Sequence, residues 1–139
     1  MYIADLHIHS RFSRATSKEG DPEHLRLWAQ RKGIRVVGTG DFTHPDWRRE
    51  LEEKLEEAGD GLYRLKKEYR LEDWQACGGE EPIFVVSGEI SSIYKKNGKM
   101  RKVHNVILLP GLEEADRLAA RLEADGTAMY GGNAVEAVV

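Results

Sequence analysis

Asp5, His7 and His9 alternate with apolar residues near the start of the chain. This period-two alternation predicts a strand over residues 5–10, with the apolar side chains on one face and the three polar ones on the other. Two imidazoles and a carboxylate on one face can bind a divalent metal such as zinc or manganese. A strand face that only meets solvent would show the same pattern, so this short motif needs support from elsewhere in the chain.

A second pair of polar residues, Asp41 and His44, comes at the end of the next predicted strand, residues 34–41. A helix predicted over residues 22–32 separates this strand from the first, and a strand–helix–strand order favours a parallel pair. Polar residues at the carboxyl ends of parallel strands form the sites of many α/β proteins. We therefore expect Asp41 and His44 to lie beside the first two histidines.

A hairpin supplies a third group of polar residues. An apolar stretch predicts a central strand over residues 83–94, and an Asn-Gly pair at 97–98 predicts a tight turn into a returning strand over residues 101–109. With a two-residue loop, Glu89 and His104 become diagonal neighbours on one face, about 7–8 Å apart. They could then share one metal ion.

The other segments predict helices and one short strand. Asp21 is suited to cap the first helix and Gly33 to end it. The remaining predicted elements are a helix over about 46–58, a short strand over 62–65, a helical turn over 67–74, a helix over about 112–125 and the start of a helix from residue 134.

Composition bounds the class of protein. The 139 residues, 40% apolar and 32% charged, are enough for one globular domain, and the net charge of −3 provides no overall basic field for nucleic acid. The single cysteine, Cys77, excludes an internal disulfide and has no nearby base, so we interpret it as a bystander in a reducing compartment. Without a long apolar run or a signal peptide, we expect a cytoplasmic protein with no membrane partner.

Six residues thus converge on one predicted site. They are His7, His9, Asp41, His44, Glu89 and His104. Four of the five histidines of the chain belong to this set, whereas random placement would scatter more of them onto helices. Imidazole and carboxylate ligands suit zinc, manganese or iron, which can activate water and clamp a phosphate, so the site predicts phosphoester hydrolysis.

Basic residues on the hairpin could hold that phosphate. Five cations lie within residues 95–102, and Lys99, Arg101 and Lys102 are the candidate phosphate contacts. A solvated hairpin tip would explain the same charges.

At this point the sequence resembles the PHP family, the polymerase and histidinol phosphatase domain. The motifs that carry the resemblance are Asp5-Leu6-His7-Ile8-His9-Ser10, Thr39-Gly40-Asp41 with His44, Gly88-Glu89, and Lys102-Val103-His104-Asn105. Within this family, the residues at 15–17, 38–45 and 93–104 are most similar to the endonuclease Q-like and UvrD-helicase-associated branch.

The resemblance implies a fold and a set of roles. The fold would be α/β, with residues 1–139 as a partial domain: the N-terminal half of a distorted (β/α)7 barrel, with a mixed sheet and a β-hairpin. Two or three ions, Zn2+ or Mn2+ or iron, would occupy a complete site. The implied metal ligands are His7, His9, His44, Glu89 and His104, with Glu89 and Asp41 as catalytic residues. Asp5 would hold a ligand histidine in one tautomer.

The sequence also departs from the family pattern. Asp41 and His44 are separated by two residues where the common motif has them adjacent, which leaves open which of the two binds metal. The family takes further ligands from the second half of its barrel, and no histidine follows His104. We therefore expect an incomplete site, weak or absent catalysis by this chain alone, and self-association through an exposed sheet edge.

The leading prediction is a nuclease-like phosphodiesterase, which by resemblance would cleave DNA beside deaminated bases or abasic sites in DNA repair. One alternative is a phosphatase of the histidinol-phosphatase kind that acts on a phosphorylated small molecule. Another is a metal-binding or interaction module without catalysis. DNA, a small phosphate ester and a second copy of the chain are the corresponding expected partners.

Overall fold

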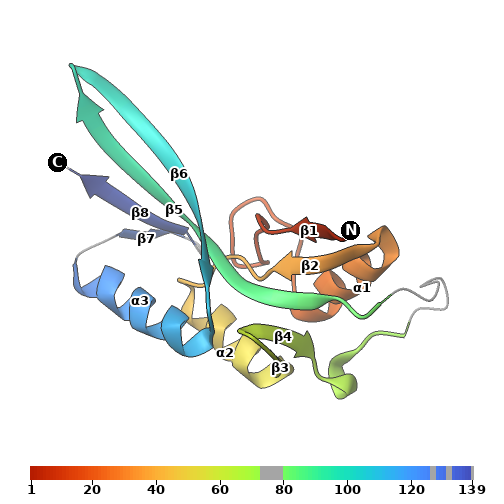
Figure 1. Cartoon of the computed structure of the whole chain (residues 1–139). Helices are drawn as coiled ribbons and strands as arrows, with labels where there is room; N and C mark the ends of the chain where they lie inside the picture. Colours follow the sequence, from red (N-terminus) through yellow and green to blue (C-terminus); the bar gives the residue numbers. More distant parts are fainter. Residues whose placement is uncertain (73–79, 126–127, 131–132, 139) are drawn as a thin grey trace.

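The computed structural model describes residues 1–72, 80–125, 128–130 and 133–138 (Figure 1). Its elements are β1 (Ile3–Asp5), α1 (Pro22–Lys32), β2 (Ile34–Gly38), α2 (Pro45–Lys54), β3 (Leu55–Gly59), β4 (Leu62–Leu65), the 3-10 turn η1 (Lys67–Tyr69), β5 (Ile83–Lys96), β6 (Lys99–Leu109), α3 (Leu112–Ala124), β7 (Ala128–Tyr130) and β8 (Asn133–Val138). Cys77 and the end of the predicted turn over 67–74 lie outside the described residues. The fold is mixed α/β.

The strands form one mixed sheet with β5 at its centre. Its main path runs β1-β2-β5-β4-β3, while β6 and β8 pair with the outer part of β5. β1 and β2 are parallel, as are β2 and β5, which confirms the predicted strand–helix–strand unit. β5 pairs with four other strands, and this confirms its predicted central place.

The β5–β6 hairpin has the predicted register. Lys96 pairs with Lys99, and the pairing continues in step down to Val86 and Leu109. Positive φ angles at Asn97 (53°) and Gly98 (73°) are those required by a two-residue turn whose twist matches its strands. The hairpin extends well beyond the rest of the molecule (Figure 1).

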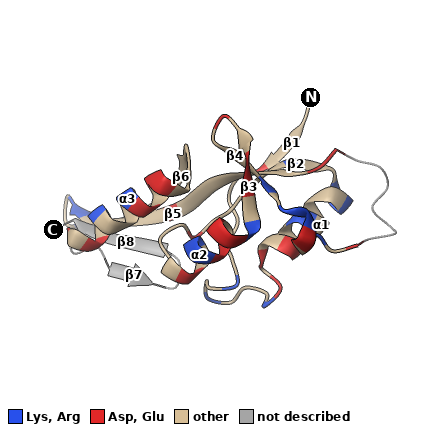
Figure 2. Cartoon of the chain, turned by 90° about the horizontal axis from the view of Figure 1, so that it is seen from below, with Lys and Arg blue, Asp and Glu red and all other residues tan. Residues whose placement is uncertain are grey.

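One apolar core joins the inner part of the sheet to all three helices. Trp47 of α2, Phe42 of the turn after β2 and Phe84 of β5 are fully buried there, with smaller residues of α1 and α3. The indole N–H of Trp47 donates to the carbonyl of Gly40 (2.9 Å), so the core also holds the turn that follows β2. Charged residues of both signs occur along α2 and α3 (Figure 2).

Both ends of α1 follow the sequence signals. The Asp21 side chain accepts a hydrogen bond from the backbone N–H of His24 (2.9 Å), and Gly33 ends the helix with a φ of 70°. The N-terminus of α3 uses a partner from another element, since the backbone N–H of Leu112 donates to the hydroxyl of Tyr63 on β4 (3.1 Å). None of the described helices is long and apolar enough to span a membrane.

Three sequence-based boundaries are wrong. The first strand ends at Asp5, so His7 and His9 lie in the loop after it and not on a strand face. The second helix ends at Lys54, because Leu55 pairs with Leu65 in the β3–β4 hairpin. The segment after residue 133 is a strand and not a helix, since its backbone pairs with the free edge of β5.

Candidate metal centre

Close backbone contacts place the histidine loop over the end of β2. A Cβ on Gly38 would lie 2.6 Å from the carbonyl oxygen of Leu6, and one on Gly40 would lie 2.3 Å from that of Ile8. Gly40 also has a φ of 67°, which favours glycine. These two glycines let the loop that carries His7 and His9 lie directly against the strand, which brings both imidazoles to the carboxyl ends of β1 and β2.

Three predicted ligands converge at this point. Glu89 Oε2 lies 2.7 Å from His7 Nε2 and 3.7 Å from His9 Nε2. The candidate ligand atoms of these three residues all lie within 4.8 Å of one another. Glu89 is 7% exposed and the two imidazoles are 51% and 30% exposed, so the carboxylate forms the floor of a site that opens to solvent at the histidines.

His104 contacts the other oxygen of the same carboxylate. Its Nδ1 is hydrogen-bonded to Glu89 Oε1, across the diagonal that the hairpin register predicts. Burial by itself raises the pKa of Glu89, but the hydrogen bonds from His7 and His104 outweigh it and hold that pKa below its ordinary value. Glu89 is therefore an anionic acceptor shared by imidazoles from two parts of the chain.

Asp41 fixes the orientation of His9. Its buried carboxylate accepts hydrogen bonds from the backbone and hydroxyl of Ser10 (2.7 and 2.6 Å) and from the hydroxyl of Ser13 (2.9 Å). Its other oxygen lies 3.0 Å from His9 Nδ1. With the proton on Nδ1, the lone pair of Nε2 points toward Glu89, which is the tautomer a metal ligand needs.

The carboxylate that contacts Nδ1 of a histidine of the loop is that of Asp41 and not, as expected, that of Asp5. Asp5 is exposed at the end of β1, and in the described part of the chain it makes no hydrogen bond to His7 or His9. Asp41 has a φ of 48°, an uncommon conformation for a residue with a side chain. That turn aims its carboxylate back at the histidine loop, and strained backbone of this kind is often found at functional sites.

His44 lies beside this cluster in the chain but outside the three-residue group. Its backbone N–H donates to the carbonyl of Asp41 (2.9 Å), and its ring stacks on Phe12 with centroids 4.3 Å apart. Its Nδ1 is buried and has no hydrogen-bond partner. A buried nitrogen without a partner is consistent with a missing ligand at that atom, so His44 stays a candidate ligand.

Two serines of β5, Ser87 and Ser91, lie beside the site but were not among the residues predicted from the sequence. Ser87 is fully buried, and its hydroxyl accepts from the backbone N–H of Gly40 (3.0 Å), which ties β5 to the turn that carries Asp41. Ser91, which pairs with His104, is buried with a hydroxyl that has no hydrogen-bond partner. The sequence signal that could have identified them is their spacing: each lies two residues from Glu89 and therefore on the same face of the strand.

The donor set fits a divalent metal. Two imidazole nitrogens and a carboxylate oxygen suit zinc, manganese or iron. The His7 ring contacts Glu89, and the His9 ring contacts Asp41. The Asp41–His9 hydrogen bond is the support that metal-binding histidines usually have. The candidate phosphate contacts Lys99, Arg101 and Lys102 are exposed on the hairpin and are not part of this group.

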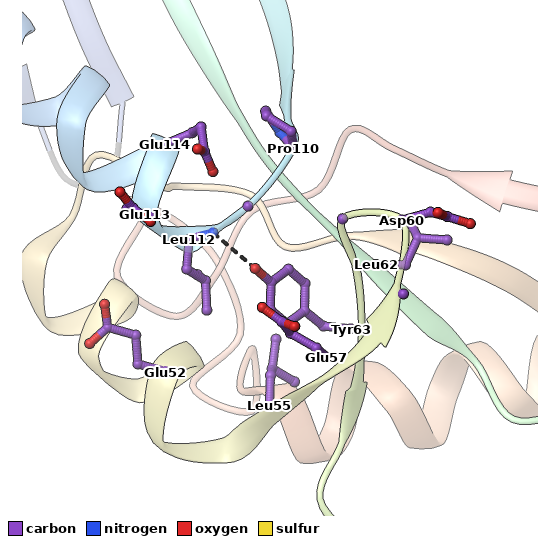
Figure 3. Close-up of a pocket in the computed structure, with 13 residues that line it drawn as sticks. Glu52, Leu55, Glu57, Asp60, Leu62, Tyr63, Pro110, Leu112, Glu113 and Glu114 are labelled. Atoms are coloured by element: carbon purple, nitrogen blue, oxygen red, sulfur yellow. Dashed lines mark hydrogen bonds between the residues drawn. The ribbon is translucent and has the colours of Figure 1, made fainter.

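A separate cavity of about 420 Å³ lies between the β3–β4 turn and the start of α3 (Figure 3). Its lining includes Glu52, Glu57 and Glu113 around the Tyr63 side chain, with no histidine or cationic residue. It contains none of the predicted site residues, and we therefore assign the candidate site to the histidine cluster.

The fold and the cluster together define a mixed α/β domain with a histidine–carboxylate centre at the carboxyl ends of parallel strands. Among solved structures, the lesion-specific endonuclease EndoQ of Pyrococcus furiosus superposes on 97% of this chain with a TM-score of 0.72 and 23% identity. Endonuclease Q in complex with a 27-mer duplex substrate that has an abasic lesion at the active site superposes on 98% of it, with the same score and identity. These likenesses show a shared fold.

Two further comparisons concern sequence alone. An uncharacterized protein of Methanocaldococcus jannaschii is 49% identical over 49 residues, which are 35% of this chain and 6% of that protein. No family model matches the sequence. The chain spans 29% of the length of the solved endonuclease Q chains.

Proposed function

We propose that this chain forms part of a PHP-type, metal-dependent phosphodiesterase that cleaves damaged DNA. The observation that carries this proposal is the convergence of His7, His9 and Glu89, with ligand atoms within 4.8 Å of one another, at the carboxyl edge of the parallel strands. The shared fold with endonuclease Q, one structure of which holds a duplex with an abasic lesion at the active site, supports the choice of DNA as substrate.

The residues of the site have distinct tasks in this proposal. His7, His9 and Glu89 would hold the metal, with His104 and His44 as further ligands. A bound divalent ion would supply a water of lowered pKa and positive charge for the phosphate oxygens. Asp41 keeps the proton of His9 on Nδ1, and Glu89 provides the negative charge that holds cations at the floor of the site.

The proposal treats the chain as the N-terminal part of a distorted barrel. On β6, Val106 and Leu108 lie beyond His104 on the side away from Lys102, and they are 42% and 48% exposed, as expected for apolar side chains that the rest of a barrel would cover. Among the described strands β6 pairs with β5 alone, and self-association through its other edge is the corresponding expectation for the chain by itself.

The test measures metal content and cleavage in parallel. The chain, reconstituted with zinc or manganese, is analysed by elemental mass spectrometry and incubated with duplexes that carry a deoxyuridine or an abasic site, and with p-nitrophenyl phosphate. We expect bound metal and slow, metal-dependent nicking of the lesion duplex. His7→Ala/His9→Ala should lose both.

The matched control is His24→Ala, because His24 lies on α1 and pairs with Asp21 away from the cluster. This variant should retain the metal. Turnover of the phosphomonoester alone would favour a phosphatase of the histidinol-phosphatase kind, and metal without any turnover would favour a binding module. No metal at all would overturn the proposal.

A further inference from the structure

The hairpin register divides its cations between two faces. Residues that pair across β5 and β6 share a face, and neighbours along a strand alternate. Lys102 pairs with Ile93, two residues beyond the His104–Ser91 pair and four beyond Glu89, so it lies on the Glu89 face. Arg101, one residue along, lies on the opposite face.

The same division applies further out. Lys95 pairs with Met100 and continues the Glu89 face, whereas Lys96 pairs with Lys99 on the opposite face. Of the three candidate phosphate contacts, only Lys102 therefore shares a face with the metal cluster. All five cations are exposed, and no carboxylate forms an ion pair with any of them in the described part of the chain.

The position of Lys102 along β6 and the packing of the opposite face also favour the Glu89 face for a bound strand. At about 3.4 Å per residue, Lys102 lies roughly 7 Å beyond His104 along β6, which places it for a phosphate next to the cluster. On the opposite face, Ile107 and Leu109 pack against the core that includes Ala115 of α3. A strand of nucleic acid on that face could not continue to Glu89 without crossing the hairpin edge.

We propose that the Glu89 face of the hairpin is a track for one DNA strand, on which Lys102 and then Lys95 bind the phosphates that flank the scissile one. Arg101, Lys96 and Lys99 make no such contact. This inference rests on the proposed function for the identity of the ligand, a phosphodiester polymer. It makes the hairpin a device for selecting polymers, because a phosphomonoester has no flanking phosphate to occupy the two lysines.

The hairpin offers a matched pair of variants. Lys95→Ala/Lys102→Ala and Lys96→Ala/Arg101→Ala remove the same charge from adjacent positions of the same two strands, on opposite faces. Binding of a labelled duplex with one abasic site is measured by fluorescence anisotropy in EDTA over a range of salt concentrations. Circular dichroism verifies that each variant is folded.

We expect the first variant to bind about tenfold more weakly, with a log–log salt slope reduced by roughly 2, and the second to change by less than about threefold. Equal losses in the two variants, or no duplex binding by the wild-type chain, would overturn the track. If the wild-type chain nicks the duplex in a metal-dependent way but both double variants lose the same duplex affinity, the proposed function holds and the track does not. If only Lys95→Ala/Lys102→Ala loses duplex affinity and no nicking is seen, the track holds and the proposed function does not.

Discussion

Two glutamates near the two ends of the buried part of β5 have different partners. Glu81, two residues before the strand, accepts hydrogen bonds from Nε and a terminal nitrogen of Arg26 (2.9 and 2.8 Å). Glu89, within the strand, is held by the imidazoles of His7 and His104. Burial raises the pKa of each carboxyl group, and in each the cationic or imidazole partner lowers it to below its ordinary value.

The difference lies in what the partners can do. A guanidinium keeps its proton and cannot bind a metal, so the Arg26–Glu81 pair is a permanent cross-link between α1 and the segment before β5. An imidazole can exchange its proton for a metal ion, so the carboxylate at Glu89 can change partners. The same residue type is structural just before β5 and available for chemistry in the middle of that strand.

The largest expected effect is on metal binding. Glu89→Gln removes the negative charge shared by the three imidazoles, and we expect affinity for zinc or manganese to fall by at least about 100-fold. Isothermal titration with the metal measures the change. Glu81→Gln is the matched control and should bind metal like the wild type. Equal affinities for all three proteins would contradict the division of roles.

For the free energy of unfolding we expect the opposite order, with a larger loss in Glu81→Gln than in Glu89→Gln. Glu81→Gln leaves the buried guanidinium of Arg26, which is 8% exposed, without its charged partner, and we expect the free energy of unfolding to fall by about 2 kcal/mol. Urea denaturation in EDTA measures it. Glu89→Gln should cost less in the same assay, and a greater loss there would mean that the histidine cluster is the main structural cross-link.

The pH dependence of stability sharpens the same contrast. Because the folded-state pKa of Glu81 is lowered, its contribution is fully present above the ordinary glutamate pKa of about 4.3 and is lost as the pH falls through the lower folded-state value. Stability of the wild type in EDTA should therefore decline below that pH more steeply than stability of Glu81→Gln. Parallel curves would show that the ion pair does not contribute.

The smallest expected effect concerns the two serines that flank Glu89. Ser91→Ala removes a buried hydroxyl without a partner and should raise the free energy of unfolding by up to about 1 kcal/mol. Ser87→Ala removes the acceptor of the Gly40 N–H and should lower it by about 1 kcal/mol. Thermal unfolding compares the pair. A loss of stability in Ser91→Ala would show that its hydroxyl has a partner in solution.

Local sequence determined much of this protein. An Asn-Gly turn between two alternating strands sets the hairpin register by itself, and that register brings His104 to Glu89. The helix over 22–32 was predictable because its cap and its terminating glycine act within one turn of the chain. The parallel pairing of β1 and β2 followed from the short helix between them.

Only the tertiary structure decided the rest, because contacts between distant segments outweigh local pattern. β1 ends at Asp5 because the next residues cross over Gly38 and Gly40, a contact about 30 residues away that the alternating pattern cannot show. For the same reason Asp41 and not Asp5 orients His9. β3 and β8 are strands because a free backbone edge was available for each to pair with, whatever the periodicity of their side chains.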